Sequence, residues 1–135
     1  MKKTTLGLIL GNINPGFEFD ITQGVNKYAQ EHGINIITFV STATSKDSFI
    51  SDYIFDSYKL IGIDALVIIY GSLTMFKNNA EIKDFLNKFV DIPYVIVQDS
   101  LKIEGKSNLI VDNKKGLKEC INHLAVDHNC KKILY

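Results

Sequence analysis

Short apolar runs alternate along this chain with segments of helical periodicity, and this alternation restricts the fold more than any other feature. The runs are four to six residues long and rich in Ile, Val and Leu. An unbroken apolar run suits a strand that is covered on both faces, as in a parallel sheet. The predicted strands are Thr5–Leu10, Asn35–Val40, Ala65–Tyr70, Tyr94–Val97, Asn108–Val111 and Lys132–Tyr135.

Four amphipathic segments lie between the predicted strands, each with an apolar stripe at helical spacing. Gly33 is predicted to end the first helix as its C′ glycine, and Asp47 or Ser48 to cap the second. Alternating strands and helices predict a doubly wound, mostly parallel α/β sheet with helices on both faces. The four stripes are Phe17/Ile21/Val25/Tyr28/Ala29, Phe49/Ile50/Tyr53/Leu60/Ile61, Ile82/Phe85/Leu86/Phe89 and Leu117/Cys120/Ile121/Leu124.

Charge and composition exclude several classes of partner. The 135 residues correspond to about one domain, and 15 basic side chains, all of them lysine, balance 15 acidic ones. A chain without net charge shows no electrostatic footprint for nucleic acid or for an anionic membrane. The apolar run at Leu6–Leu10 is too short for an export signal, and two cysteines are too few for a disulfide framework. We expect a cytoplasmic protein.

Polar loops follow the predicted strands. In open α/β sheets, ligands bind outside the carboxyl ends of the strands, where the strand order reverses. That rule selects the loops at 11–17, 41–47, 70–74 and 98–100, which are rich in Asn, Ser, Thr and Gln. Such side chains suit the hydroxyls and amides of a small molecule better than phosphates.

No catalytic or nucleotide-binding motif is present. The glycines of GNINPG lie five apart, which is not the G-x-G-x-x-G frame, and no lysine followed by Ser or Thr forms a P-loop. No G-x-S-x-G elbow occurs, and the three histidines lie at helix ends and faces. We therefore expect neither an enzyme nor a cofactor.

Four side chains near the end of the chain, Cys120, His123, His128 and Cys130, are of the types that zinc prefers. Cys120 belongs to the apolar stripe of the fourth helix, where a free cysteine acts as a small apolar residue. The spacing C-x2-H-x4-H-x-C matches no known zinc finger. The sequence therefore predicts no metal site.

Several segments together resemble the LacI/GalR-type ligand-binding domain, which has the type 1 periplasmic-binding-protein fold. In GFEFDITQGVNKYAQEHGINI, an aromatic residue precedes a glycine–hydrophobe pair as in the first helix of that family, and IPYVIVQDS resembles its fourth strand. The run LIVDNKKGLKECINHLAVDHNCKKILY resembles the family block v-x-v-D-N-x-x-G-x-x-x-A-x-x-H-L, with Cys120 in place of the usual alanine. This last block is the most specific part of the resemblance.

The resemblance implies a bilobal small-molecule sensor with a flavodoxin-like strand order in its first lobe. Residues 1–111 would form the amino-terminal lobe and 112–135 the first helix and strand of the second, because the family's domain is about twice as long as this chain. The effector, a sugar, nucleobase or similar metabolite, would bind between the lobes of a homodimer, and the chain would cross between the lobes at a hinge, Asp112 and Asn113. The ligand-binding residues implied by position are Asn12, Asn14, Phe17, Gly71, Ser72, Gln98 and Asp99.

Other features separate this chain from a complete repressor. No helix-turn-helix precedes the first predicted strand, so we expect no contact of this segment with nucleic acid. The segments GSLTMFKNNAEIKDFLNKF and DHNCKKILY resemble a variant of the domain that serves as an input module of bacterial diguanylate cyclases and related signalling proteins. Phe19 and Phe55 lie off their helix stripes and favour an alternative, a dimerisation lobe that binds no ligand.

Overall fold

The computed structural model describes residues 3–11, 13, 16–40, 57–73, 78–97 and 105–134. Five parallel strands form one sheet in the order β2-β1-β3-β4-β5. This order is flavodoxin-like, and the predicted doubly wound α/β fold is confirmed. The strands are β1 (Thr5–Leu10), β2 (Asn35–Val40), β3 (Ala65–Ile69), β4 (Tyr94–Val97) and β5 (Ser107–Leu109).

Three strands have the predicted bounds, and two differ. β3 ends at Ile69 because Tyr70 begins a four-residue helix, α4 (Tyr70–Leu73). β5 begins at Ser107 and ends at Leu109, so Ile110 and Val111 lie outside the sheet and are exposed. An edge strand has a neighbour on one side only, so its apolar residues need not continue the ladder.

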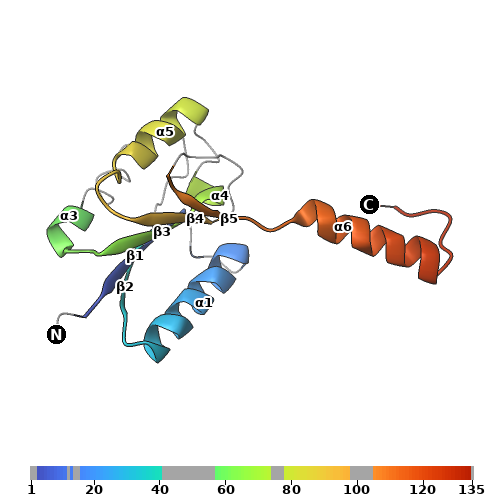
Figure 1. Ribbon diagram of the computed structural model, residues 1–135, viewed down its shortest axis with the longest axis horizontal. Helices are drawn as coiled ribbons and strands as arrows, with labels where there is room; N and C mark the ends of the chain where they lie inside the picture. Colours follow the sequence, from blue (N-terminus) through green and yellow to red (C-terminus); the bar gives the residue numbers. More distant parts are fainter. Residues whose placement is uncertain are drawn as a thin grey trace.

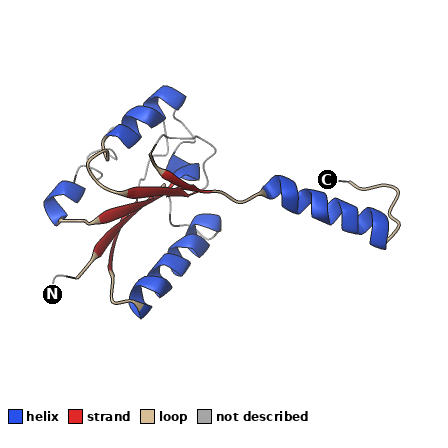
Figure 2. Ribbon diagram, in the orientation of Figure 1, coloured by secondary structure: helices blue, strands red, loops and turns tan. Residues whose placement is uncertain are grey.

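The helices cover both faces of the sheet (Figures 1 and 2). Helix α1 (Phe17–Glu31) lies on one face, and α3 (Tyr58–Ile61) and α5 (Asn79–Asn87) lie on the other. Because successive side chains of a strand point to opposite faces, β1 contributes Leu8 and Leu10 to the α1 side and Ile9 to the α5 side. All three are buried, as expected for a strand covered on both faces.

Local signals set the helix ends. Asn78 forms a capping box at the start of α5: its Oδ1 accepts hydrogen bonds from the backbone N–H groups of Ala80 (2.9 Å) and Glu81 (3.1 Å). The Glu81 carboxylate in turn accepts from the N–H of Asn78 at 2.7 Å. At the end of α1, Gly33 has φ 66°, which confirms it as the C′ glycine.

The larger core lies between the sheet and α5. The predicted third stripe is confirmed, because Ile82, Phe85, Leu86 and Phe89 are all buried. The rings of Phe85 and Phe89 meet edge to face, with centroids 5.2 Å apart. Tyr58 packs against Phe89 and donates a hydrogen bond from its hydroxyl to the Lys88 carbonyl at 2.9 Å, which ties α3 to the end of α5.

Gly7 lies where neighbouring side chains leave no room for a Cβ atom. A Cβ atom at this position would lie 2.5 Å from Cδ2 of Leu66, 3.0 Å from Cδ1 of Ile63 and 3.3 Å from Cε2 of Phe39. Leu66 is buried and cannot swing aside into solvent. Packing therefore excludes a side chain at position 7 of β1.

The second predicted stripe is only partly described, and its described end is wrong. Residues 49–53 lie outside the described residues. Leu60 and Ile61 are exposed, and Tyr58 is instead the buried anchor of α3. A helix of a single turn has room for one inward-facing residue, so Tyr58 replaces the predicted pair.

The last part of the chain forms an arm that extends away from the sheet (Figure 1). It consists of α6 (Asn113–Asn122) and a π-helical turn, η1 (His123–Asp127), and neither contains a buried residue. The fourth predicted stripe is present in the helix, but Leu117, Cys120, Ile121 and Leu124 are exposed. Periodicity identified the face correctly, and within the described residues nothing buries it.

The predicted strand Lys132–Tyr135 is not formed over residues 132–134, which are irregular and exposed; Tyr135 lies outside the described residues. A strand requires a neighbour for its backbone N–H and C=O groups. Among the described residues, no strand pairs with this segment. The described helices include none long and apolar enough to span a membrane.

Candidate functional site

The carboxyl ends of all five strands meet at one edge of the sheet, because every pairing is parallel. The chain leaves β1 toward β2 on one side, and β3 lies on the other side of β1. The direction of winding therefore changes between β1 and β3, and a crevice outside this edge is the usual ligand site of such sheets. The candidate site lies where β1 ends at Leu10 and β3 ends at Ile69.

Phe17 is the one predicted binding residue whose side chain is described on the β1 side of this crevice. It is the first residue of α1 and is 42% exposed. Gly16 precedes it with φ 140°, a conformation that residues with a Cβ rarely adopt. This glycine lets the chain turn sharply into the helix, and the Phe17 ring stays partly open to solvent at the helix start.

On the β3 side, the predicted loop at 70–74 is a helical turn over Tyr70–Leu73, and this corrects the loop expectation. Leu73 is buried and anchors the turn, while Gly71 is half-buried. Gly71 and Ser72 therefore stand in the first turn after β3, at the predicted edge. The side chain of Ser72 lies outside the described residues.

The remaining predicted ligand residues, Asn12, Asn14, Gln98 and Asp99, lie outside the described residues. Their described neighbours are at the right edge: Gly11 follows the end of β1, and Val97 is the last residue of β4. The assignment of these four residues to a ligand stays a prediction.

The predicted hinge residues begin the arm. Asp112 is the N-cap of α6, and its Oδ1 accepts a hydrogen bond from the Lys115 N–H at 2.9 Å. The Asn113 N–H donates to the Val111 carbonyl at 2.9 Å. These two bonds lie where the extended chain after β5 passes into α6, and the role of Asp112 and Asn113 as a hinge stays a prediction.

Among the titratable groups of the described residues, one pKa shift is resolved, and it lies away from this crevice. Burial raises the pKa of the Tyr94 phenol above its ordinary value. Tyr94 is the first residue of β4, at the opposite edge of the sheet, and the Lys106 ammonium stands 4.2 Å from the centre of its ring. Tyr94 therefore supports the fold and not the candidate site.

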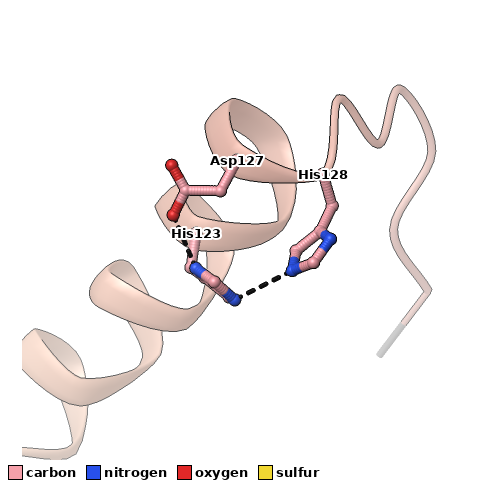
Figure 3. A network of polar contacts seen from close by, with 3 residues as sticks. All are labelled: His123, Asp127 and His128. Carbon is pink, nitrogen blue, oxygen red and sulfur yellow. Dashed lines mark hydrogen bonds and ion pairs between the residues drawn. The ribbon is translucent and has the colours of Figure 1, made fainter.

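A polar network that the spacing did not predict joins two of the candidate metal ligands, His123 and His128, with Asp127 in the arm (Figure 3). The His123 Nδ1–H donates to Asp127 Oδ2 at 2.6 Å, and the Nε2 atoms of His123 and His128 lie 3.0 Å apart. The π-helical turn brings the two histidines together, since the His128 N–H donates to the His123 carbonyl, five residues back. Across the described ranges, no group of three or more His, Cys, Asp or Glu side chains surrounds a common metal position.

Comparison with solved structures supplies the class of protein that has this fold. The chain superposes on a candidate ribose operon repressor from Burkholderia thailandensis with a TM-score of 0.68 and 17% identity, over 93% of this chain and 45% of that one. It superposes on the transcription regulator CcpA of Lactococcus lactis with a TM-score of 0.63 and 24% identity, over 99% of this chain and 46% of that one. A LacI-family transcriptional regulator from Lactobacillus casei with bound glucose gives 0.59 and 12%, over 93% and 43%.

These similarities establish that the chain has the fold found in LacI-family transcription regulators, and that it spans less than half the length of those three chains. No model of a known protein family matches the sequence, and no curated protein matches it.

Proposed function

We propose that this chain is the first lobe, residues 1–111, and the start of the second lobe, residues 112–135, of a small-molecule sensor in a bacterial transcriptional or signalling regulator. The observation that carries the proposal is the sheet order together with the structural similarity to three such regulators over at least nine-tenths of this chain. The chain senses and does not catalyse, because no catalytic constellation emerged from its sequence.

The effector in this proposal is a sugar- or nucleobase-like molecule held outside the carboxyl edge of the sheet. Support comes from the partly exposed Phe17 ring at that edge and from glucose bound to one of the structural neighbours. Aromatic faces suit the apolar face of a sugar ring, and Asn, Gln and Asp side chains pair with its hydroxyls. Asn12, Asn14, Gln98 and Asp99 are the polar partners that we assign, beside Gly71 and Ser72.

Signalling in this proposal is a shift between open and closed lobes. A ligand shifts such an equilibrium only by its difference in affinity for the two states. Asp112 and Asn113 act as the hinge in this proposal, since they join the extended chain after β5 to the first turn of α6. We place the regulator in the cytoplasm as a homodimer.

Thermal unfolding with graded glucose, ribose, adenosine and guanine tests the sensing function. A ligand that binds the folded chain raises its Tm as concentration increases. We expect one of these classes to raise Tm, and we expect Phe17→Ala and Asp99→Asn each to abolish that rise. Tyr28→Ala is the matched control, because Tyr28 is an exposed aromatic residue in the same helix, more than two turns away. The sensing proposal fails for this chain if no class raises Tm.

The second candidate is a dimerisation lobe without a ligand. Phe19 in α1 supports the dimerisation lobe, because its aromatic ring is partly exposed, although the neighbouring residue Glu18 is buried. Sedimentation velocity over a concentration series distinguishes the two candidates. The dimerisation lobe would be favoured by a dimer that Phe19→Ala weakens, together with no rise in Tm with any effector. A chain that stays monomeric at every concentration would exclude it.

The output of the regulator is proposed from the sequence of the arm. The DHNCKKI segment resembles input modules of diguanylate cyclases, which favours a cyclase or kinase output. Sequencing the coding DNA on both sides of this segment tests the assignment. A cyclase or kinase domain would support it, and an upstream helix-turn-helix would replace it with a DNA-binding output.

A further inference from the structure

The rings of His123 and His128 in the arm lie side by side, an arrangement that a regular α-helix would not give them. His123 and His128 are five residues apart, a spacing that an α-helix places on different faces. The π-helical turn η1 lowers the rotation per residue and brings both rings to one side, where they meet at 86° with centroids 4.6 Å apart. Single π-turns occur frequently at functional sites.

The carboxylate of Asp127 selects the tautomer of the first ring. Because Asp127 accepts the hydrogen bond from Nδ1 of His123, the proton of the neutral ring is on Nδ1, and its Nε2 lone pair faces Nε2 of His128 and accepts a hydrogen bond from it. A carboxylate behind a histidine is the arrangement that orients metal-ligating imidazoles in proteins and raises their basicity. His123 can give its Nε2 lone pair to a cation when the proton on Nε2 of His128 moves through solvent to Nδ1 of the same ring, which leaves a lone pair on each Nε2 atom.

The separation of the two Nε2 atoms is that of neighbouring ligands on one ion. With metal–nitrogen bonds of about 2.0–2.1 Å, two nitrogens 3.0 Å apart subtend roughly 91–97° at the metal. An angle near 90° matches square-planar or octahedral coordination, which Cu²⁺ and Ni²⁺ adopt with nitrogen ligands, better than the tetrahedral geometry of structural zinc. Both rings are exposed, so they can turn toward a shared ion without repacking any core residue.

We propose that His123 and His128 form a two-nitrogen binding site for a divalent late transition-metal ion of the Cu²⁺/Ni²⁺ class, with Asp127 as the positioning residue behind His123. Water completes the coordination, in keeping with a site that has two protein ligands and no third within the described residues. The site does not include Cys120, and it is therefore not the four-ligand zinc cluster that the sequence analysis rejected. It is independent of the proposed sensing function.

Titration calorimetry with Ni²⁺ tests this site, because Ni²⁺ does not oxidise thiols as Cu²⁺ does. The tag-free chain carries Cys120→Ser and Cys130→Ser, so that the two exposed thiols contribute nothing to the binding. We expect one Ni²⁺ per chain, and at least tenfold weaker binding in His123→Gln and in His128→Gln. Asp127→Asn should weaken binding about tenfold, the low end of the effect of an outer-shell partner.

His32 supplies the matched control. It is exposed at the end of another helix, and its Nδ1–H donates to the Tyr28 carbonyl at 2.8 Å, but it has no second histidine beside it. His32→Gln should leave the affinity unchanged. The proposal is overturned if the chain takes up no Ni²⁺, if His32→Gln weakens binding as much as His128→Gln, or if the double serine background abolishes binding.

Broadening of histidine proton signals by paramagnetic Ni²⁺ gives a second readout that does not depend on any variant. The ring signals of His123 and His128 should broaden at substoichiometric Ni²⁺ while those of His32 stay sharp. Equal broadening of all three rings would contradict the proposal even if the variants unfold the turn.

Discussion

Helices α5 and α6 share an amphipathic sequence pattern but differ in the burial of their apolar face. Both are short amphipathic helices with an N-cap side chain, and both carry an apolar stripe at helical spacing. The stripe of α5 is buried against the sheet, with Phe89 just beyond the helix at 0% exposure, whereas Leu117 of α6 is 55% exposed. Amphipathicity thus shows which residues share one face of a helix. That face stabilises the fold only where a neighbouring surface buries it.

The largest expected difference comes from truncating each stripe. Phe89→Ala should lower the free energy of unfolding by about 3–5 kcal/mol, because it removes a fully buried ring and leaves a cavity. Leu117→Ala should change it by less than about 0.5 kcal/mol, as for other exposed positions. Urea unfolding followed by circular dichroism measures both values. Equal losses would mean that α6 packs on a surface in solution.

A smaller effect is expected from adding a methyl group at two glycines. Gly7→Ala should cost about 1–3 kcal/mol, since the new Cβ meets the buried Leu66 at 2.5 Å. Gly24→Ala is the control: nothing lies within 4 Å of its Cβ position in α1, and alanine should stabilise this helix by about 0.5–1 kcal/mol. Thermal unfolding of the two variants should therefore shift in opposite directions, and a shift in the same direction would contradict the packing at β1.

The helix caps provide a third test. Asn78→Ala should lower the stability of the sheet domain by about 1 kcal/mol, because α5 unfolds together with the core it covers. Asp112→Ala removes a comparable cap from α6 but should leave the main urea transition unchanged and reduce helical signal only. Hydrogen exchange at Glu81 and Lys115 measures the two effects separately. A lower urea midpoint in Asp112→Ala would show that the arm and the sheet unfold as one unit.

The smallest effect concerns a single phenol in the sheet region. Because the folded pKa of Tyr94 is raised above its ordinary value of 10.0, the neutral ring is favoured in the fold. Its contribution to stability is complete below about pH 10 and is lost as the pH rises through the folded pKa. Absorbance at 295 nm should show a late-titrating phenol that Tyr94→Phe removes. A titration curve unchanged in shape by this variant would argue against the burial.

The sequence predicted the sheet well because its signals are local. Unbroken apolar runs specify β1, β2 and β4 with their bounds, and Gly33 specifies the end of α1. What the sequence could not specify is the surface that covers a given face. In both the exposed stripe of α6 and the missing strand at 132–134 the local pattern was present, but among the described residues nothing buries the stripe and no strand pairs with 132–134.

For the candidate sites too, the sequence predicted some features and not others. The switch-point rule selected an edge of the sheet, and the structure places Phe17 and Gly71 there. The sequence singled out His123 and His128 as candidate metal ligands, but it did not predict their contact, because a period of 3.6 residues separates positions 123 and 128 and only the π-helical turn brings them together. The spacing of five residues between two histidines, with an aspartate four after the first, is the signal that could have revealed it.

The end of the sheet at β5 affects how copies of this protein behave when concentrated. β5 is an edge strand of three residues, and Leu109, Ile110 and Val111 form an exposed aliphatic run where it ends. Open edges with such residues are templates for pairing between molecules. Lys106 precedes β5 and Asp112 follows this run, and pairing with another molecule would remove water from both charged side chains. We therefore expect these two charges to oppose aggregation, besides their contacts with Tyr94 and with the start of α6.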